Sequence, residues 1–202
     1  MSAQSEIGAD SPVVMIRGTL VGLGPLDRRH IPLYLRWMND PEVTRGLGRS
    51  GPFTREMEEH WFERASTSTD GVLFTIYEME SLRPIGTIGL DDINRHQLAA
   101  TFGISIGEKS CWNRGYGTEA TRLMLDYAFN LLGLQNVMLA VYSFNPRAQR
   151  AYEKAGFRVI GRRRRLIPLA GERYDEILMD AIPEEFESPV LKTLLTAEQQ
   201  RP

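Results

Sequence analysis

The chain has 202 residues, of which 42% are apolar and 25% charged, and its formal net charge is −2. This length predicts one domain with a substantial hydrophobic core, and the small net charge excludes a global field that would draw the chain to nucleic acid or to a membrane. The apolar runs are too short to span a bilayer, and the single cysteine, Cys111, excludes an internal disulfide and fits a reducing cytoplasm. The three histidines are scattered without zinc-ligand spacing, so we expect no metal site.

The N-terminal part of the sequence predicts a lead-in, a strand and a helix. Residues 1–12 are polar and unpatterned, and we expect them to be a flexible lead-in to a domain over residues 13–182. Residues 13–23 are rich in β-forming residues and predict one strand. Asp27 is a suitable N-cap for a helix that ends before Pro41, because the residue before a proline avoids the α region. The apolar side of this helix carries Ile31, Tyr34, Leu35 and Met38.

A glycine-rich segment separates this helix from the next one. Residues 43–52 contain three glycines and two arginines, Arg45 and Arg49, which predicts a surface loop. Thr54 is a suitable cap for a second helix that runs to Ala65. On this helix we expect the acidic side chains to face water and the aromatic ones to face the protein; these are Glu58, Glu59 and Glu63, and Trp61 and Phe62.

The middle of the sequence predicts successive antiparallel strands. Residues 72–79 and 85–90 form a hairpin around the turn at 81–84. A polar turn at residues 94–97 leads into a further strand, which ends at Gly107.

A helix and a buried strand follow. Apolar residues at helical spacing from Ala120 to Leu131 predict a helix with one buried face, and Gly133 is its expected C-cap. Residues 137–142 are apolar on both faces, which is typical of a central strand covered by helices. The helix between this strand and the preceding one allows the two to pair in parallel.

The C-terminal part predicts a helix, a hairpin and a tail. Asn145 and Pro146 favour the start of a helix that ends at Gly156. Residues 158–166 and 173–181 form a hairpin, and its four arginines at 162–165 are typical of a solvated edge strand, with a nucleic-acid patch as the alternative. Residues 183–202 are a weakly amphipathic tail, which either packs as a short helix on a partner or stays loose. The edge strand and the tail are compatible with a homodimer.

The most informative stretch joins a strand, a loop with two glycines and a helix. The strand alternates through Phe102, Ile104 and Ile106, and the loop and first helical turn cover residues 113–118. The N–H groups at the start of a helix have no partner inside it, and the helix dipole makes that end positive. With the fixed charge of Arg114, the loop is suited to a phosphate or pyrophosphate, although a tight strand-to-helix turn alone would also use these glycines.

This stretch resembles a known family. The sequence W-N-R-G-Y-G-T-E-A at residues 112–120 resembles motif A of the GNAT acetyltransferases, in the form of the branch that acetylates ribosomal-protein N-termini (RimJ/RimL-like). Trp112 stands where the strict pattern has Arg or Gln. The segments 39–43, 85–90 and 145–157 resemble the same branch in the same order, so the resemblance covers roughly residues 16–182. It implies a single α/β domain, with a mixed, mostly antiparallel sheet, a splayed parallel pair and helices on both faces.

The resemblance also implies how acetyl-CoA binds. The pyrophosphate would lie on the loop, and the pantetheine arm would pair with the free edge of the strand near Gly103, where the family has a bulge. Asn145 would hydrogen-bond the pantetheine arm, and Tyr152 would be the general acid for the CoA thiolate. A helix cap and simple packing are the alternative roles of these two residues. The implied cofactor-binding residues are Ile104, Ser105, Ile106, Asn113, Arg114, Gly115, Tyr116, Gly117, Thr118, Asn145 and Tyr152.

The general base is missing from this pattern. Many relatives carry a glutamate in the segment that here reads Ala99-Ala100-Thr101-Phe102, and this chain has Thr101 near that place. Asp91, Asp92 and Glu119 are the other candidates, Asp92 through a chain of water, although Glu119 is better explained as an acid at the helix N-terminus that the dipole stabilises. An α-amine has a pKa of about 7.7–8 against about 10.4 for lysine, so the missing carboxylate favours a peptide N-terminus or an amino sugar over a polyamine or lysine.

Three activities remain open at this point. The resemblance implies acetyl transfer from acetyl-CoA to a primary amine by direct attack, with a protein N-terminus as the suggested acceptor. The alternatives are acetylation of a small amine (an amino sugar, polyamine or antibiotic) and a non-catalytic acyl-CoA sensor, against which Asn145 and Tyr152 argue. Candidates for contacting the acceptor are Trp37, Arg45 and Asp92, and in the family the segment after Val43 closes over the acceptor. An acetylated Cys111 is disfavoured, because no histidine pairs with it in sequence.

Overall fold

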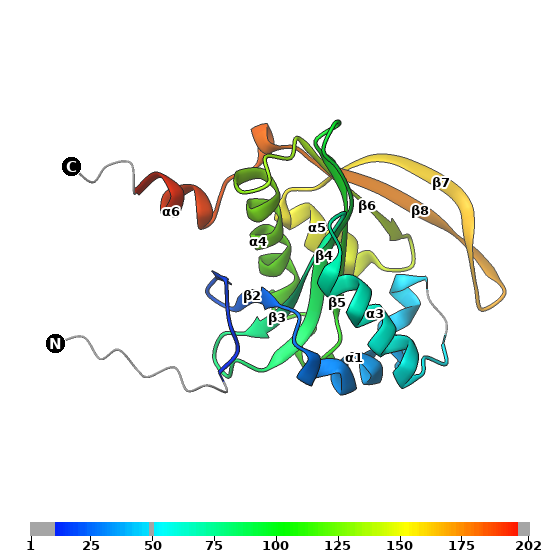
Figure 1. Ribbon diagram of the computed structural model, residues 1–202. Coiled ribbons are helices and arrows are strands. Elements are labelled where there is room, and N and C mark those ends of the chain that lie inside the picture. The colour runs from blue at the N-terminus through cyan, green and yellow to red at the C-terminus, as the bar shows by residue number, and fades with distance from the viewer. Residues whose placement is uncertain (1–10, 49–50, 198–202) are drawn as a thin grey trace.

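The computed structural model describes residues 11–48 and 51–197, and its centre is an eight-stranded sheet in the order β1-β2-β3-β4-β5-β6-β8-β7 (Figure 1). All neighbouring strands are antiparallel except β5 and β6, which are parallel. The strands are β1 (Ile16–Arg17), β2 (Val21–Pro25), β3 (Val72–Glu78), β4 (Pro84–Asn94), β5 (Ala99–Ile106), β6 (Asn136–Tyr142), β7 (Arg158–Leu169) and β8 (Glu172–Ala181). The predicted mixed sheet with one parallel pair is confirmed.

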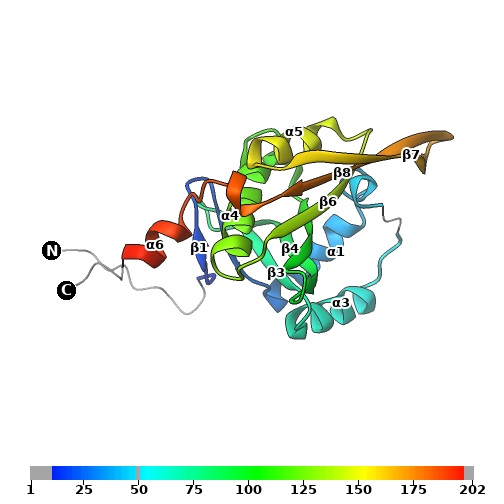
Figure 2. The same cartoon turned by 90° about the horizontal axis from the view of Figure 1, so that it is seen from above.

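Helices cover both faces of the sheet, with α4 and α5 on one side and α1 and α3 on the other (Figure 2). The helices are α1 (Ile31–Met38), α2 (Pro41–Thr44), α3 (Arg55–Thr67), α4 (Tyr116–Asn130), α5 (Pro146–Ala155) and α6 (Leu191–Ala197), with short 3₁₀ helices η1 (Arg28–His30), η2 (Arg45–Leu47), η3 (Lys109–Cys111) and η4 (Pro183–Glu185). The main core lies between α4 and the sheet, and a smaller aromatic core joins α1, α2 and α3. None of the described helices combines the length and apolar character needed to cross a membrane.

The parallel pair separates soon after it forms. β5 and β6 are in register only from Ala99 to Thr101, opposite Asn136 to Met138. Beyond Thr101, β5 continues to Ile106 with β4 as its partner on the opposite side. The edge of residues 102–106 that faces β6 therefore has no strand partner within the sheet that the described residues form.

The bulge that we expected at Gly103 is wrong. The register between β4 and β5 is continuous from the Gly86–Ile106 pair through Gly89–Gly103. The irregularity lies further along, between Asp91 and Asn94, where Asp92 has a φ of 52°. The extra residue is accommodated at the outer end of β4, next to the turn into β5.

The first predicted strand is in fact two short strands with a turn at Gly18–Leu20. The carboxylate of Glu119, in the first turn of α4, accepts the backbone N–H groups of Thr19, Leu20 and Val21 at 3.0, 2.7 and 2.7 Å. A side chain about 100 positions away thus fixes the turn, which no local pattern could reveal. The same contacts make Glu119 a structural residue and exclude it as the general base.

One further expectation is corrected, and another agrees with the structure. Along β6, Val137, Leu139 and Val141 are buried while Met138 is 39% exposed, so helices cover one face of this strand and not both. The hydrophobic pattern could not show this, because the residues on the open face are apolar as well, although no helix covers them. The arginines at 162–165 are all exposed on the edge strand β7, as expected for a solvated edge.

The C-terminal tail packs against its own domain. Asp126 of α4 is fully buried and accepts hydrogen bonds from the Ser188 hydroxyl (2.6 Å) and from the N–H groups of Val190 (3.0 Å) and Leu191 (2.8 Å). These contacts hold the start of α6, and Leu191 is buried beside α4. The loose or partner-bound tail that we expected is therefore wrong for residues 188–191. The lead-in at 1–10 and residues 198–202 lie outside the described residues, and the domain boundaries stay predictions.

Replacing Asp126 with alanine should destabilise the fold. The change leaves the Ser188 hydroxyl and two backbone N–H groups without their acceptor in a buried place, which we expect to cost about 3 kcal/mol. Urea unfolding of Asp126→Ala and of the exposed control Glu187→Ala would measure it. A loss no larger than that of the control would contradict the tail contact.

Candidate active site

The loop before α4 has the backbone that its glycines predict. Gly115 is the N-cap of α4 and has a φ of 85°, a left-handed conformation that favours glycine. Asn113 also has a positive φ, of 60°. The helix therefore starts abruptly at Tyr116, and its first N–H groups have no partner inside the helix.

A cavity of about 330 Å³ lies in front of this loop, between β5 and α5. Ten of the eleven predicted cofactor-binding residues line it: Ile104, Ser105, Ile106, Asn113, Gly115, Tyr116, Gly117, Thr118, Asn145 and Tyr152. Arg114 does not line the cavity, and its guanidinium lies 5.2 Å from the centre of the Tyr116 ring. The structure thus brings together residues from three separate stretches of the sequence.

Three cations that sequence reasoning missed also line this cavity. They are Arg147, Arg150 and Lys154, all from α5, and no carboxylate accompanies them in the lining. The guanidinium of Arg147 lies 3.9 Å from the centre of the Trp112 ring. Burial, and then the nearby charge of Arg45, lower the pKa of Arg147, so this cation would be stabilised by an anion. Their i, i+3 and i+7 spacing, which places all three on one face of the helix, was the signal that the sequence offered.

Tyr152 lies at the wall of this cavity among aromatic rings. Its ring packs edge-on against Phe102 and Phe157, with centroids 5.9 and 6.0 Å away. Desolvation raises the pKa of Tyr152 to about 12. A thiol has a pKa of about 8.5, so complete proton transfer from this phenol to a thiolate is uphill, and donation of a hydrogen bond is the easier role.

Asn145 caps α5 through its side-chain oxygen, and its side-chain NH₂ group is available to donate hydrogen bonds to a ligand. Its Oδ1 accepts the N–H of Ala148 at 3.2 Å, which caps α5. The two donors on Nδ2 lie on the side of Gly46, at the wall of the cavity. One side chain can therefore serve both roles that the sequence left open.

A second, larger cavity of about 750 Å³ lies on the α1 and α3 side of β5. It has Leu47, Ile104 and Ser105 in common with the first cavity, so the two adjoin at the free edge of β5. Trp37 and Asp92, which we expected to contact an acceptor, line it, whereas Arg45 lines neither cavity. Thr101 also lines neither one.

The second cavity contains a carboxylate that we expected to be exposed to solvent. Glu58 is only 4% exposed and lines this cavity together with Asp91 and Asp92. Glu58 lies four residues before the buried Phe62, so both are on the inner face of α3. The spacing of four residues could have indicated that Glu58 faces inward. We did not use it, because a charged residue is normally expected to face water.

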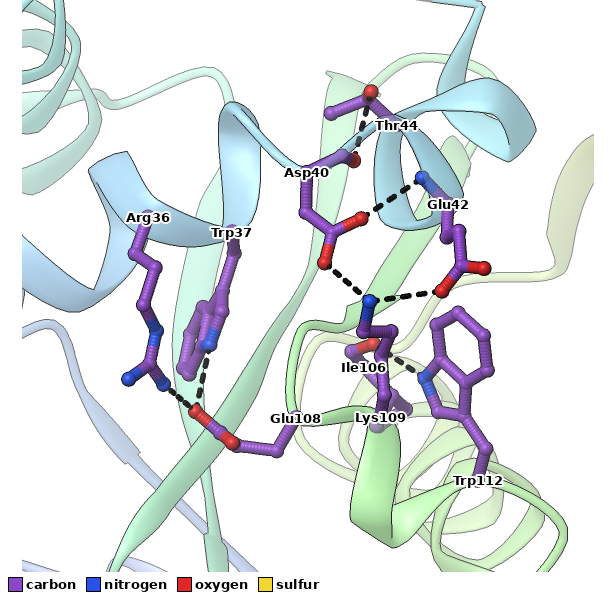
Figure 3. A network of polar contacts seen from close by, with 9 residues as sticks. All are labelled: Arg36, Trp37, Asp40, Glu42, Thr44, Ile106, Glu108, Lys109 and Trp112. Atoms are coloured by element: carbon purple, nitrogen blue, oxygen red, sulfur yellow. Dashed lines mark hydrogen bonds and ion pairs between the residues drawn. The ribbon is translucent and has the colours of Figure 1, made fainter.

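Residues 43–47, the first part of the segment expected to be a surface loop, are helical, and the start of α2 is joined by ion pairs to η3, which precedes the loop before α4 (Figure 3). Lys109 Nζ lies 2.8 Å from both Asp40 Oδ2 and Glu42 Oε2, at the N-terminus of α2. Trp37 donates to Glu108 Oε1 at 2.9 Å, and Arg36 pairs with the same carboxylate. The helices that wall both cavities are thus tied to residues 108–109, just after β5.

An ion pair between the buried Glu78 and the partly exposed Arg83 supports the loop from behind. Glu78 accepts hydrogen bonds from the Tyr116 hydroxyl (2.8 Å), Arg83 Nε (2.7 Å) and the Ser81 hydroxyl (2.7 Å). These contacts, with Arg83 first, lower the pKa of Glu78 to about 2. Arg83 also donates to the sulfur of Cys111 at 3.3 Å, and Cys111 is 2% exposed. This placement gives Cys111 a structural partner and favours no nucleophilic role.

Glu78 should make stability depend on acid pH. Its pKa is about 2 in the fold against an ordinary 4.5, so its contribution is complete above pH 4.5 and is lost as the pH falls from 4.5 towards 2. We expect Glu78→Gln to be less stable than the wild type at pH 6.5, with a difference that shrinks at pH 3. Urea unfolding at both pH values measures it, with the exposed Glu63→Gln as control. A difference that does not change with pH would contradict this assignment.

Comparison with known proteins agrees with this geometry. The family model described as "Acetyltransferase (GNAT) domain" matches residues 21–158. The probable N-acetyltransferase YjcK of Bacillus subtilis is 36% identical over 98 residues, 48% of this chain, and the match spans about half of that protein (54%). The human alpha/beta-tubulin-N-acetyltransferase 9 is 28% identical over 159 residues, which are 71% of this chain and 74% of that protein.

A solved structure shows the same fold. The spermidine N-acetyltransferase from Vibrio cholerae, in complex with CoA and spermine, superposes with a TM-score of 0.76 at 21% identity, covering 83% of this chain and 98% of that one. The RimJ/RimL-like branch stays a prediction. Because the family model matches more than half of the 202 residues, the chain belongs to the GNAT family of acetyl-CoA-dependent N-acetyltransferases.

Proposed function

We propose that this protein transfers the acetyl group of acetyl-CoA directly to a primary amine while both are bound. The observation that carries the proposal is the meeting of two cavities of opposite charge at the free edge of β5. Leu47, Ile104 and Ser105 line both cavities, so a thioester reaching this edge from one side would meet an amine from the other. Bringing two reactants together in this way supplies much of the rate of a bimolecular reaction.

The residues of the first cavity fit acetyl-CoA, which supplies an activated thioester. The N-terminus of α4 and the cations Arg147, Arg150 and Lys154 would hold its phosphates. The edge of residues 104–106 that has no strand partner would hydrogen-bond the amides of the pantetheine arm as a neighbouring strand does. Asn145 would add its free side-chain donors.

The transfer step needs a neutral amine. The ammonium ion first releases one proton to a carboxylate or water. The nitrogen then forms a bond to the carbonyl carbon as the bond from carbon to sulfur breaks, and a second proton from the nitrogen ends on the sulfur. Tyr152 would donate a hydrogen bond to the leaving sulfur, which ends as the thiol of CoA. The net reaction converts an ammonium ion and acetyl-CoA into an amide, CoA and one proton.

The acceptor that we propose first is a protein N-terminal α-amine. The RimJ/RimL-like motifs support it, and so does the human relative that is named for acetylation of tubulin, a protein. A small cationic amine is the second candidate, favoured by the three carboxylates in the lining of the second cavity. The earlier argument from a missing carboxylate no longer separates the two, because Glu58 supplies one.

Acetyl-CoA should bind to the purified protein, and Gly115→Glu should abolish that binding. The change places bulk and negative charge where we expect the pyrophosphate, so affinity should fall about 100-fold or more, as calorimetry would measure. Gly133→Glu is the matched control, because Gly133 also has a positive φ (68°) but lies at the other end of α4. No binding to the wild type, or equal loss in both variants, would refute the cofactor site.

Tyr152→Phe should lower kcat about 100-fold and leave acetyl-CoA affinity nearly unchanged, because the hydroxyl acts on the leaving sulfur. The assay is CoA release with a panel of N-terminal peptides, amino sugars and polyamines. Tyr127→Phe is the control, since Tyr127 packs on Phe74 away from both cavities. Unchanged turnover would remove Tyr152 from the mechanism, and no CoA release with any amine would favour the sensor.

A further inference from the structure

The edge strand β7 carries more positive charge than its neighbour β8 neutralises. Residues 162–165 are four consecutive arginines, and all of them are exposed. Carboxylates of β8 pair with the first two, through Asp175 at 3.1 Å and Glu176 at 2.9 Å. The last two, Arg164 and Arg165, have no carboxylate within ion-pair distance in residues 11–48 and 51–197. The strand therefore presents two adjacent guanidinium groups that are free to bind an anion.

A bulge in β7 holds these two arginines. The register with β8 is irregular between Arg163 and Ile167, so that three residues of β7 stand opposite the single residue Asp175. One oxygen of Asp175 accepts the backbone N–H of Arg165 at 2.7 Å, and the other oxygen pairs with Arg162. Exposed charge protects an edge strand from pairing with another copy of the chain, but that protection needs no fixed bulge. Bulges are frequent beside functional sites, where they re-aim side chains, and this one indicates a binding role for its cations.

The arginines lie at the same end of the sheet as the junction of the two cavities. Leu47 lines both cavities, and the next residue, Gly48, packs so closely on the Tyr142 hydroxyl that a Cβ atom would clash with it. Tyr142 of β6 stands opposite Glu176 of β8, which in turn stands opposite Arg163 of β7. Figures 1 and 2 show the β7–β8 hairpin extending past the other strands, at the end of the molecule where the light-blue α2 lies.

The distance from this junction to β7 suits a polypeptide. The strands β6 and β8 stand between β5 and β7, so the span is three strand spacings of about 4.8 Å, widened where β5 and β6 separate. An extended chain advances about 3.3 Å per residue and would reach β7 at about its fifth residue. The intervening face of β6 has no covering helix and leaves Met138 39% exposed, so it offers an open path.

The charge of the hairpin favours an acidic polypeptide over nucleic acid. Residues 158–181 contain six arginines and four carboxylates, a formal excess of only two positive charges. Tight binding to nucleic acid needs many phosphate contacts along a backbone of uniform negative charge, and the carboxylates of β8 would repel such a backbone. Two free guanidinium groups match two or three carboxylates, which arginine binds in a bidentate manner.

We propose that Arg164 and Arg165 are a docking surface for acidic side chains of a polypeptide acceptor, at about its fifth to eighth residues. This inference rests on the proposed function, since it places the N-terminal amine of that polypeptide at the edge of β5. It makes the two arginines specificity-determining residues that lie outside both cavities. Because they bind the acceptor far from the reacting atoms, they lower KM and leave kcat unchanged.

The test measures binding separately from turnover. Two fluorescent peptides of about twelve residues share an Ala-Ser-Gly-Gly N-terminus and carry either glutamate or glutamine at residues five to eight. Anisotropy with CoA-saturated protein should show the glutamate peptide binding about tenfold more tightly in dilute buffer, and the preference should vanish near 1 M salt, where charges are screened within about 3 Å. Moving the glutamates to residues two to four should abolish the preference, because they would then lie near Asp92.

Variants locate the surface. Arg164→Gln with Arg165→Gln should remove the preference, whereas lysine at both positions keeps the charges and should retain part of it. Arg17→Gln with Arg95→Gln is the matched control, since it removes two exposed arginines that line neither cavity and lie away from β7. In CoA release with the wild type, the glutamate peptide should have a KM about tenfold lower than the glutamine peptide, at equal kcat.

The outcomes separate this inference from the proposed function. No binding of the glutamate peptide, equal binding of the two peptides, or a preference that survives both glutamine substitutions would overturn the docking surface, even if the enzyme acetylates the peptides. A single-stranded DNA that binds more tightly than the glutamate peptide, and is lost with the two arginines, would also overturn it. Arginine-dependent binding of the glutamate peptide without CoA release from any amine would support the docking surface and overturn the transfer.

Discussion

The separation of β5 from β6 after three paired residues is the constraint on which the site depends. Backbone N–H and carbonyl groups need partners, and an edge left open inside a sheet is normally a liability. Here the opening lies between two layers of helices, so the edge of residues 104–106 that faces away from β4 borders the two cavities. An extended, amide-rich ligand can take the place of the missing strand, and the proposed function puts the chemistry at this gap inside the sheet.

Side chains on both sides keep this opening in place. The ring of Tyr152 packs edge-on against Phe102 and Phe157, next to the point where β5 separates from β6. At the end of β5, the Trp112 indole donates to the Ile106 carbonyl at 2.8 Å. The ion pairs of Lys109 and Glu108 attach α1 and α2 at the same end. The wall of the second cavity and the loop before α4 thus both adjoin the short segment of residues 106–112, so a structural change in one is transmitted to the other.

Local signals in the sequence predicted most of the fold and half of the site. Patterns only a few residues long predicted the strand β5, the loop before α4 and the start of α5: alternation, two glycines and an Asn-Pro pair. The resemblance to the family motif then suggested that these three elements surround one ligand. The sequence did not reveal the contacts of Glu119 and Asp126, because both carboxylates bind groups that are far away in sequence. Glu58 was expected to face water, because a charged side chain is seldom buried. The hydrophobic pattern of a sequence counts every carboxylate as a surface residue. Only the packing of the helices in the structure shows which carboxylates are buried. The bulge was misplaced because a glycine permits an irregular backbone without requiring one.

The position of Cys111 has a consequence for chemical labelling. The thiol is almost fully covered, it accepts a hydrogen bond from Arg83, and what exposure it has is toward the first cavity. An alkylating reagent would reach it through the first cavity, which is the route that we propose for acetyl-CoA, and the adduct would push into the loop that Tyr116 and Glu78 support. Inactivation by such a reagent, with protection by CoA, would therefore arise from steric blockage alone. Those two results, which are commonly taken as the signature of an acyl-cysteine intermediate, carry no information about covalent catalysis in this enzyme.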